Sequence, residues 1–189
     1  MKKMFMLTLF ILLSFVSFAQ EQPDAEMMQA WQAYMTPGEM HELLGQMVGE
    51  WNTEITMWMD PSAEPTKSTG TSVYKAILDG RYFTGEHHAS FMNMPMIGNE
   101  LVGYDNAKKK FFSTWIDNFG TGILYMEGTL DPETKVITYF GKSTDPMGVE
   151  SDVKQTITYS DKDKGFMEMF TMKDGQEFKT MELTFTRTK

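Results

Sequence analysis

The sequence has no cysteine in its 189 residues and only three histidines, His41, His87 and His88. The absence of cysteine excludes disulfides, thiol nucleophiles and a lipid anchor on an N-terminal cysteine. The histidines lack the spacing of a zinc site, and no glycine-rich phosphate loop leads from a strand into a helix. Acid–base work by carboxylates such as Glu86 and Asp117 would require the fold to bring them together. We therefore predict no catalytic residue, and no cofactor unless the metal or haem alternative considered below applies.

Long apolar stretches are absent except at the start, "MKKMFMLTLFILLSFVSFAQ". This segment opens with Lys2 and Lys3, stays apolar to about Val16 and has small residues before a cut between Ala19 and Gln20. A basic start, an apolar run too short to cross a bilayer comfortably and a small-residue cleavage site are typical of a secretory signal peptide. We assign residues 1–19 to a signal peptide and expect a soluble periplasmic or secreted protein with no transmembrane segment.

Positive charge is also scarce: the chain has 17 Lys and Arg residues against 26 Asp and Glu residues, which gives a formal net charge of -9. Loss of Lys2 and Lys3 with the signal peptide changes -9 to about -11. Nucleic-acid phosphates and anionic membrane surfaces repel such an acidic chain. The expected partner is therefore not a nucleic acid, which leaves small molecules, metal ions and proteins.

The chain after the signal peptide begins with a helical segment over 20–47. Met27, Trp31 and Tyr34 recur at helical spacing, and Thr36-Pro37-Gly38-Glu39 is typical of the start of a second short helix, which should end near residue 44. The remaining part, 48–189, is long enough for one domain with a real core.

From Trp51 onward the apolar residues alternate with polar ones, and turn residues interrupt the pattern at short intervals. The alternation predicts ten strands, at 51–59, 68–78, 81–91, 97–104, 110–117, 122–130, 135–142, 151–159, 165–173 and 177–187. Ten antiparallel strands in sequential order leave too much exposed edge to remain flat. We therefore predict an all-β fold: a closed, up-and-down, lipocalin-like β-barrel, with a sandwich as the less favoured alternative.

The two ends of the predicted barrel carry a matching pair of residues. Trp51 follows Gly49 and Glu50 at the start of the first strand, and Arg187 lies near the end of the last. The first and last strands of a closed barrel are neighbours, so Arg187 should lie over the Trp51 indole in a cation–π contact. A Gly-x-Trp start and a terminal basic residue resemble the lipocalin and calycin superfamily.

A more specific resemblance covers most of the chain beyond the signal peptide. It is carried by "GEW" (49–51), "LDGRYFTGEH" (78–87), "MPMIGNELVGYDNAKKKFFSTWIDNFGTG" (94–122), "EGTLDPETK" (127–135) and "MELTFTR" (181–187). These stretches resemble the domain-of-unknown-function family 1579 (DUF1579), and the "GYDN" and "STWIDN" pair is the most specific part. The resemblance implies a bacterial protein with a lipocalin-like barrel. It supplies no catalytic residues, because the family has no settled activity.

Two sets of residues are candidates for a ligand site. Tyr104, Trp115 and Asp117 could form an aromatic and acidic patch at a pocket mouth. The alternative is that Asp117, like Asp105, only hydrogen-bonds the backbone of its turn. On the strand over 81–91, His87 falls on the more apolar face and should point inward. There it could bind a ligand, a metal or haem iron, or it could be hydrogen-bonded within the core.

A methionine-rich stretch follows that strand, with Met92, Met94 and Met96 at alternate positions. Thioether sulfurs select Cu(I), so these residues and His87 form an alternative metal site. The opposing interpretation is a flexible apolar hairpin tip, because the chain has 19 methionines and Pro95 should end the strand.

We therefore expect an exported protein that binds a small apolar or amphipathic molecule inside the barrel, without catalysis. The expected ligand-binding residues are Trp51, His87, Tyr104, Trp115, Asp117 and Arg187. Two alternatives remain open: copper or haem handling through His87 and the methionines, and a solid barrel that acts through its surface as an envelope interaction module.

Overall fold

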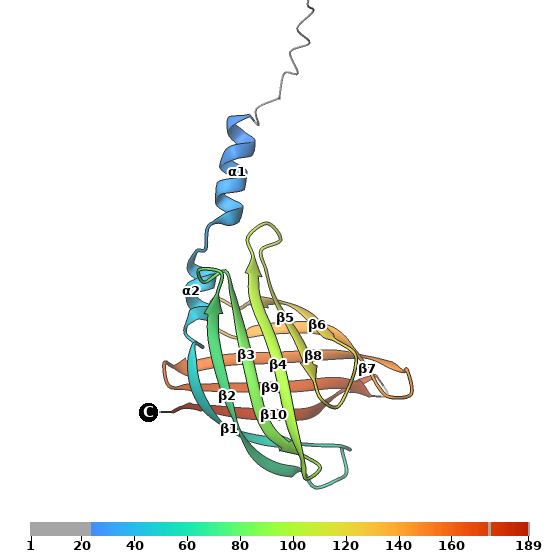
Figure 1. Cartoon of the computed structure of the whole chain (residues 1–189). Helices are drawn as coiled ribbons and strands as arrows, with labels where there is room; N and C mark the ends of the chain where they lie inside the picture. Colours follow the sequence, from blue (N-terminus) through green and yellow to red (C-terminus); the bar gives the residue numbers. More distant parts are fainter. Residues whose placement is uncertain (1–23, 174, 189) are drawn as a thin grey trace, which may run out of the picture.

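The computed structural model describes residues 24–173 and 175–188, and the expected signal peptide lies outside this range. Within it, ten strands form a closed barrel in which each strand is antiparallel to the next and β1 pairs with β10 (Figure 1). The strands are β1 (Gly49–Met57), β2 (Thr66–Ile77), β3 (Tyr82–Phe91), β4 (Met94–Asp105), β5 (Lys110–Asp117), β6 (Leu124–Leu130), β7 (Ile137–Thr144), β8 (Glu150–Asp161), β9 (Lys164–Lys173) and β10 (Gln176–Arg187). The predicted up-and-down, lipocalin-like barrel is confirmed.

The alternation of side chains along the strands explains why the sheet closes around one core. On β1, Trp51, Thr53 and Ile55 are buried, whereas Asn52 and Glu54 between them are exposed. Successive side chains of a strand point to opposite faces, so this pattern gives one inner and one outer face. Closing the sheet pairs β1 with β10, so each of the ten described strands has a neighbour on both sides.

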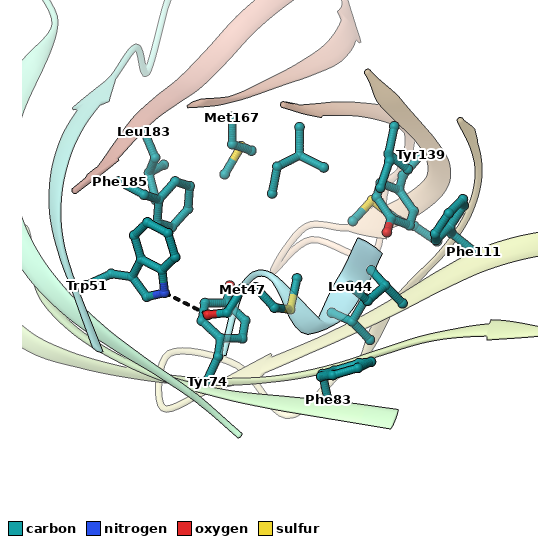
Figure 2. Close-up of a cluster of buried hydrophobic side chains, with 14 of the residues drawn as sticks. Leu44, Met47, Trp51, Tyr74, Phe83, Phe111, Tyr139, Met167, Leu183 and Phe185 are labelled. Atoms are coloured by element: carbon teal, nitrogen blue, oxygen red, sulfur yellow. Dashed lines mark hydrogen bonds between the residues drawn. The ribbon is translucent and has the colours of Figure 1, made fainter. Parts of the chain in front are cut away.

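The hairpin turns fall alternately at the two ends of the barrel, because each strand reverses direction. The turns after β2 and β4 lie at one end, where α2 (Glu39–Gly45) packs against β3 and β4. Figure 2 shows Leu44 and Met47 from this segment among core side chains that include Phe83 and Phe111. We call this the closed end, and the opposite end, with the turns after β1, β3 and β5, the open end.

The first helix, α1 (Ala25–Met35), projects away from the barrel beyond α2 (Figure 1). Asp24 caps it by accepting a hydrogen bond from the Met27 amide at 2.7 Å. At its other end, Asn106 donates to the carbonyls of Tyr34 and Thr36 at 3.2 and 2.8 Å. The helix is therefore held through its C-terminal carbonyls rather than by a buried face. No helix in the described ranges is long and apolar enough to span a membrane.

The hairpin between β3 and β4 differs from the prediction, which placed the connection over 92–96, between strands at 81–91 and 97–104. The turn contains only Met92 and Asn93, both with positive φ (51° and 61°), and β4 resumes at Met94. Pro95 pairs with Ser90 inside the strand. It is tolerated because β4 pairs with β5 only from Gly98 onward, so no neighbouring strand needs the missing amide proton.

Candidate functional site

A cavity of about 310 Å³ occupies the half of the barrel toward the open end. Its walls are largely apolar and include Ile55, Met126, Ile157, Met167, Leu183 and Phe185. Met57, Phe91 and Phe119, near the turns of the open end, also line it. The barrel is therefore filled toward α2 and hollow toward the hairpin turns.

A carboxylate, Glu100, lies on the inner face of β4 and lines this cavity. Tyr74 donates its hydroxyl to Glu100 Oε2 at 2.8 Å, and Ser113 donates to Oε1 at 2.8 Å. Burial raises the pKa of Glu100, but the nearby His87 and the hydrogen bonds from Ser113 and Tyr74 outweigh that effect and hold the pKa below its usual value. These contacts favour the carboxylate form of Glu100 inside the barrel.

His87 lies beside this carboxylate, on the inner face of β3 as the alternation predicts. Its Nδ1 is 2.8 Å from Ser72 Oγ, and its Nε2 is 3.7 Å from Glu100 Oε2. That separation is too long for a hydrogen bond, and Nε2 is buried with no hydrogen-bond partner among the described residues. A carboxylate facing Nε2 favours a proton on that nitrogen.

Gly85 and Gly98 make room for the rings around Glu100. A Cβ atom on Gly85 would lie 2.7 Å from His87 Nε2. A Cβ atom on Gly98 would lie 2.3 Å from Trp115 Cη2, so the indole lies against the backbone of β4. The centroids of the His87 and Trp115 rings are 5.0 Å apart. Only a residue without a side chain fits at these two positions.

Asp117 has two roles at the open end of the cavity. Its Oδ2 accepts a hydrogen bond from Trp115 Nε1 at 2.7 Å, which fixes the indole. Its Oδ1 accepts from the backbone amides of Phe119 and Gly120, at 2.9 and 3.2 Å, which forms the turn after β5. The turn role considered from the sequence is observed, and the other oxygen of the same carboxylate holds Trp115 at the cavity.

The structure brings together three of the six residues expected to bind ligand. His87, Trp115 and Asp117 line the cavity. Tyr104 lies at the closed end, where its ring contacts Phe111 at 4.8 Å between centroids.

Trp51 and Arg187 also lie at the closed end, as predicted. The Arg187 guanidinium is 4.1 Å from the Trp51 ring centroid. Trp51 donates to the Met47 carbonyl at 2.7 Å, as Figure 2 shows. Arg187 further donates to the carbonyls of Val48, Gln46 and Lys162 at 2.7, 2.8 and 2.9 Å. These contacts fix the closed end of the barrel.

The methionines of the alternative metal site do not gather around His87. Met92 is 69% exposed in the turn and Met94 is 49% exposed. Met94 pairs with Phe91, four residues from His87, or about 13 Å along the strand. Of the three methionines in this stretch, Met96 alone lines the cavity. Among the described residues, no group of three or more His, Asp or Glu side chains could hold a metal ion.

The sequence analysis missed the polar residues that surround His87 in the cavity wall. Ser72 is hydrogen-bonded to His87, Glu100 lies beside it, and Tyr74 and Ser113 donate to Glu100; the four come from three different strands. The inward direction of Glu100 could have been predicted from the sequence, because it alternates with Gly98 and Val102 on the face of β4 that points inward. The pairing between strands that brings these residues together cannot be predicted from the alternation along any one strand.

Comparison with known proteins gives a family and a fold. Residues 36–187 match the family described as "Protein of unknown function (DUF1579)". No curated protein matches the chain. Among solved structures, Rv2717c from M. tuberculosis is similar with a TM-score of 0.61 and 12% identity, over 82% of this chain and 100% of that one. The S-type phycobiliprotein lyase CPES from Guillardia theta is similar with a TM-score of 0.56 and 11% identity, over 88% and 99%. At these identities the two structures support the barrel fold alone.

Proposed function

The chain belongs to the DUF1579 family of proteins of unknown function, and we propose that it binds a small amphipathic molecule in the barrel cavity without transforming it. The observation that carries this proposal is a largely apolar cavity with the Glu100 carboxyl group on its wall, held by hydrogen bonds from Tyr74 and Ser113. Ligand sites in proteins are typically concave and apolar, with a few polar groups that fix orientation.

The cavity sets the size of the ligand. A volume of about 310 Å³ corresponds to roughly ten water-sized groups, if each takes about 30 Å³. That suits a molecule of about ten non-hydrogen atoms, such as a medium-length alkyl chain or a fused aromatic pair. The apolar walls suit the apolar body of such a molecule.

The proposal is tested by measuring the binding of 1-octanol by calorimetry. Ile157, 8% exposed, lines the cavity, and Thr158 next to it on β8 points to the other face. Ile157→Trp should fill the cavity, and Thr158→Trp is its matched control with the same added side chain. We expect one octanol per chain for the wild type and Thr158→Trp, and at least about tenfold weaker binding for Ile157→Trp.

The other two functions considered from the sequence are tested beside it, with Cu(I) and haem titrated into the same protein. No octanol binding to a folded wild type would refute the proposal and favour an interaction module. Stoichiometric Cu(I) or haem binding that is lost in His87→Ala would favour metal or haem handling instead.

We also propose that the protein acts outside the cytoplasm, in the periplasm or beyond it. The support is the basic and apolar start of the sequence with a cleavage site after Ala19. N-terminal sequencing of the exported protein should begin at or near Gln20. Recovery of the full-length chain in the cytoplasm would contradict this.

A further inference from the structure

We propose that the ligand is a cationic amphiphile, whose protonated amine lies against Glu100 while its apolar body fills the cavity. This inference rests on the proposed function and adds the chemical class of the headgroup.

The first support is the sign of the charges around the cavity. Glu100 and Asp117 both line it, and none of the described residues that line it is a lysine or an arginine. Two histidines, His87 and His88, also line it, but the His88 ring is half-exposed on the outer face and lies 2.7 Å from Glu86, so His87 is the buried one of the two. An anionic headgroup would therefore meet carboxylates without a fixed positive partner, which is unfavourable at low dielectric.

The second support is the direction of the hydrogen bonds at Glu100. Tyr74 and Ser113 use their hydroxyl protons on this carboxylate. The hydroxyls of Tyr74 and Ser113 can therefore offer a ligand only oxygen lone pairs, and so can the Glu100 carboxylate. A headgroup that donates matches this set, and an ammonium carries three donors and no acceptor.

The third support is that no cationic group of the described residues lies within hydrogen-bond distance of Glu100, whose contact with His87 is a long ion pair at 3.7 Å. The nearest candidate, His87 Nε2, lies 3.7 Å away, outside hydrogen-bond range, on a residue that is only 8% exposed. Nε2 has no other hydrogen-bond partner among the described residues. A nearly buried carboxylate is stabilised when a cation contacts it directly, and a ligand ammonium would make that contact.

The surroundings of Glu100 also suit a cation. Trp115 pairs with Glu100 across β4 and β5, and its indole lines the cavity. An indole face attracts ammonium groups. Asp117 lies two residues further along β5, about 7 Å closer to the open end. A cation entering from that end would pass a carboxylate before reaching Glu100.

The test compares three probes with the same tail: octylammonium, 1-octanol and octanoate, titrated into the full chain at neutral pH. We expect octylammonium to bind about tenfold more tightly than octanol, and octanoate to bind more weakly than octanol. Glu100→Gln should bring the first two within about threefold of each other. The control is Glu54→Gln, which removes an exposed carboxylate from β1 and should leave the ranking unchanged.

The ranking on the unmodified protein needs no variant, so it decides the question even if Glu100→Gln does not fold. Octanol or octanoate as the tightest probe would overturn the inference, as would a preference for octylammonium that survives in folded Glu100→Gln. Equal binding of all three would overturn the headgroup class and leave the proposed function standing. No binding of any probe would overturn both.

Discussion

Arg187 offers the sharpest test of how the barrel is held at its closed end. The side chain donates to three backbone carbonyls, those of Gln46, Val48 and Lys162, and lies 4.1 Å from the Trp51 ring centroid. It thereby joins the segment after α2, the turn after β8 and the first and last strands. The change to make is Arg187→Ala, with Arg187→Lys as the variant that keeps the charge.

The magnitude follows from these contacts. Hydrogen bonds from a charged donor contribute about 1.5 to 3 kcal/mol each, but the Arg187 side chain is 25% exposed, so about 1 kcal/mol each is appropriate. The cation–π contact adds about 0.5 to 1 kcal/mol. Arg187→Ala should therefore lower the free energy of unfolding by about 4 kcal/mol, and Arg187→Lys by about 2 kcal/mol, because a lysine cannot reproduce the planar fork.

Urea unfolding followed by circular dichroism measures this change. The midpoint should fall while the slope with denaturant stays constant, because the folded barrel buries the same surface. Arg81→Ala is the control: Arg81 donates to the carbonyls of Met35 and Leu78 outside the barrel, so its loss should cost less than about 1 kcal/mol. A loss of less than about 1 kcal/mol in Arg187→Ala would refute the argument.

Three further predictions follow from other parts of the structure. Gly98→Ala should displace the Trp115 indole, because the new Cβ would lie 2.3 Å from Cη2. The near-ultraviolet circular dichroism spectrum should change and octanol binding should weaken; an unchanged spectrum would contradict the close packing of Trp115 on Gly98. Burial, with the charge of Glu100, raises the pKa of Tyr74 and of Tyr139 well above their usual value near 10, so both must stay neutral in the fold. Their contribution is fully present below pH 10 and is lost above it, so the free energy of unfolding should fall as pH rises past about 10; a free energy of unfolding that stays constant above pH 10 would contradict this. Asn106→Ala should speed proteolysis between α1 and α2 without lowering the urea midpoint of the barrel, and an unchanged cleavage rate would show that Asn106 does not hold α1.

The fold could be predicted from the sequence because its main signal is periodic. Alternation and turn residues gave the ten strands, and closure of a sequential sheet then made Trp51 and Arg187 neighbours. The inward direction of His87 followed from the same alternation on β3. These inferences need only the order of residues along one strand or at the two ends of the chain.

The site could be predicted only in part, because it depends on register between strands. Ser72 pairs with His87, and Glu100 with Trp115, through pairings that no single strand reveals. Tyr104 lies on the same strand as Glu100 but four residues away, about 13 Å along it, at the closed end rather than at the cavity. Glu100 was passed over because a carboxylate on an inner face breaks the apolar pattern.

The central claim is that the cavity holds a small organic molecule. Native mass spectrometry of the protein purified from its own host, beside Ile157→Trp prepared in the same way, tests it most directly. We predict a wild-type mass increased by one small organic molecule, released by gentle activation and absent from Ile157→Trp. Bare protein that gains no mass when octylammonium is added, or a bound copper or haem that is lost in His87→Ala, would contradict it.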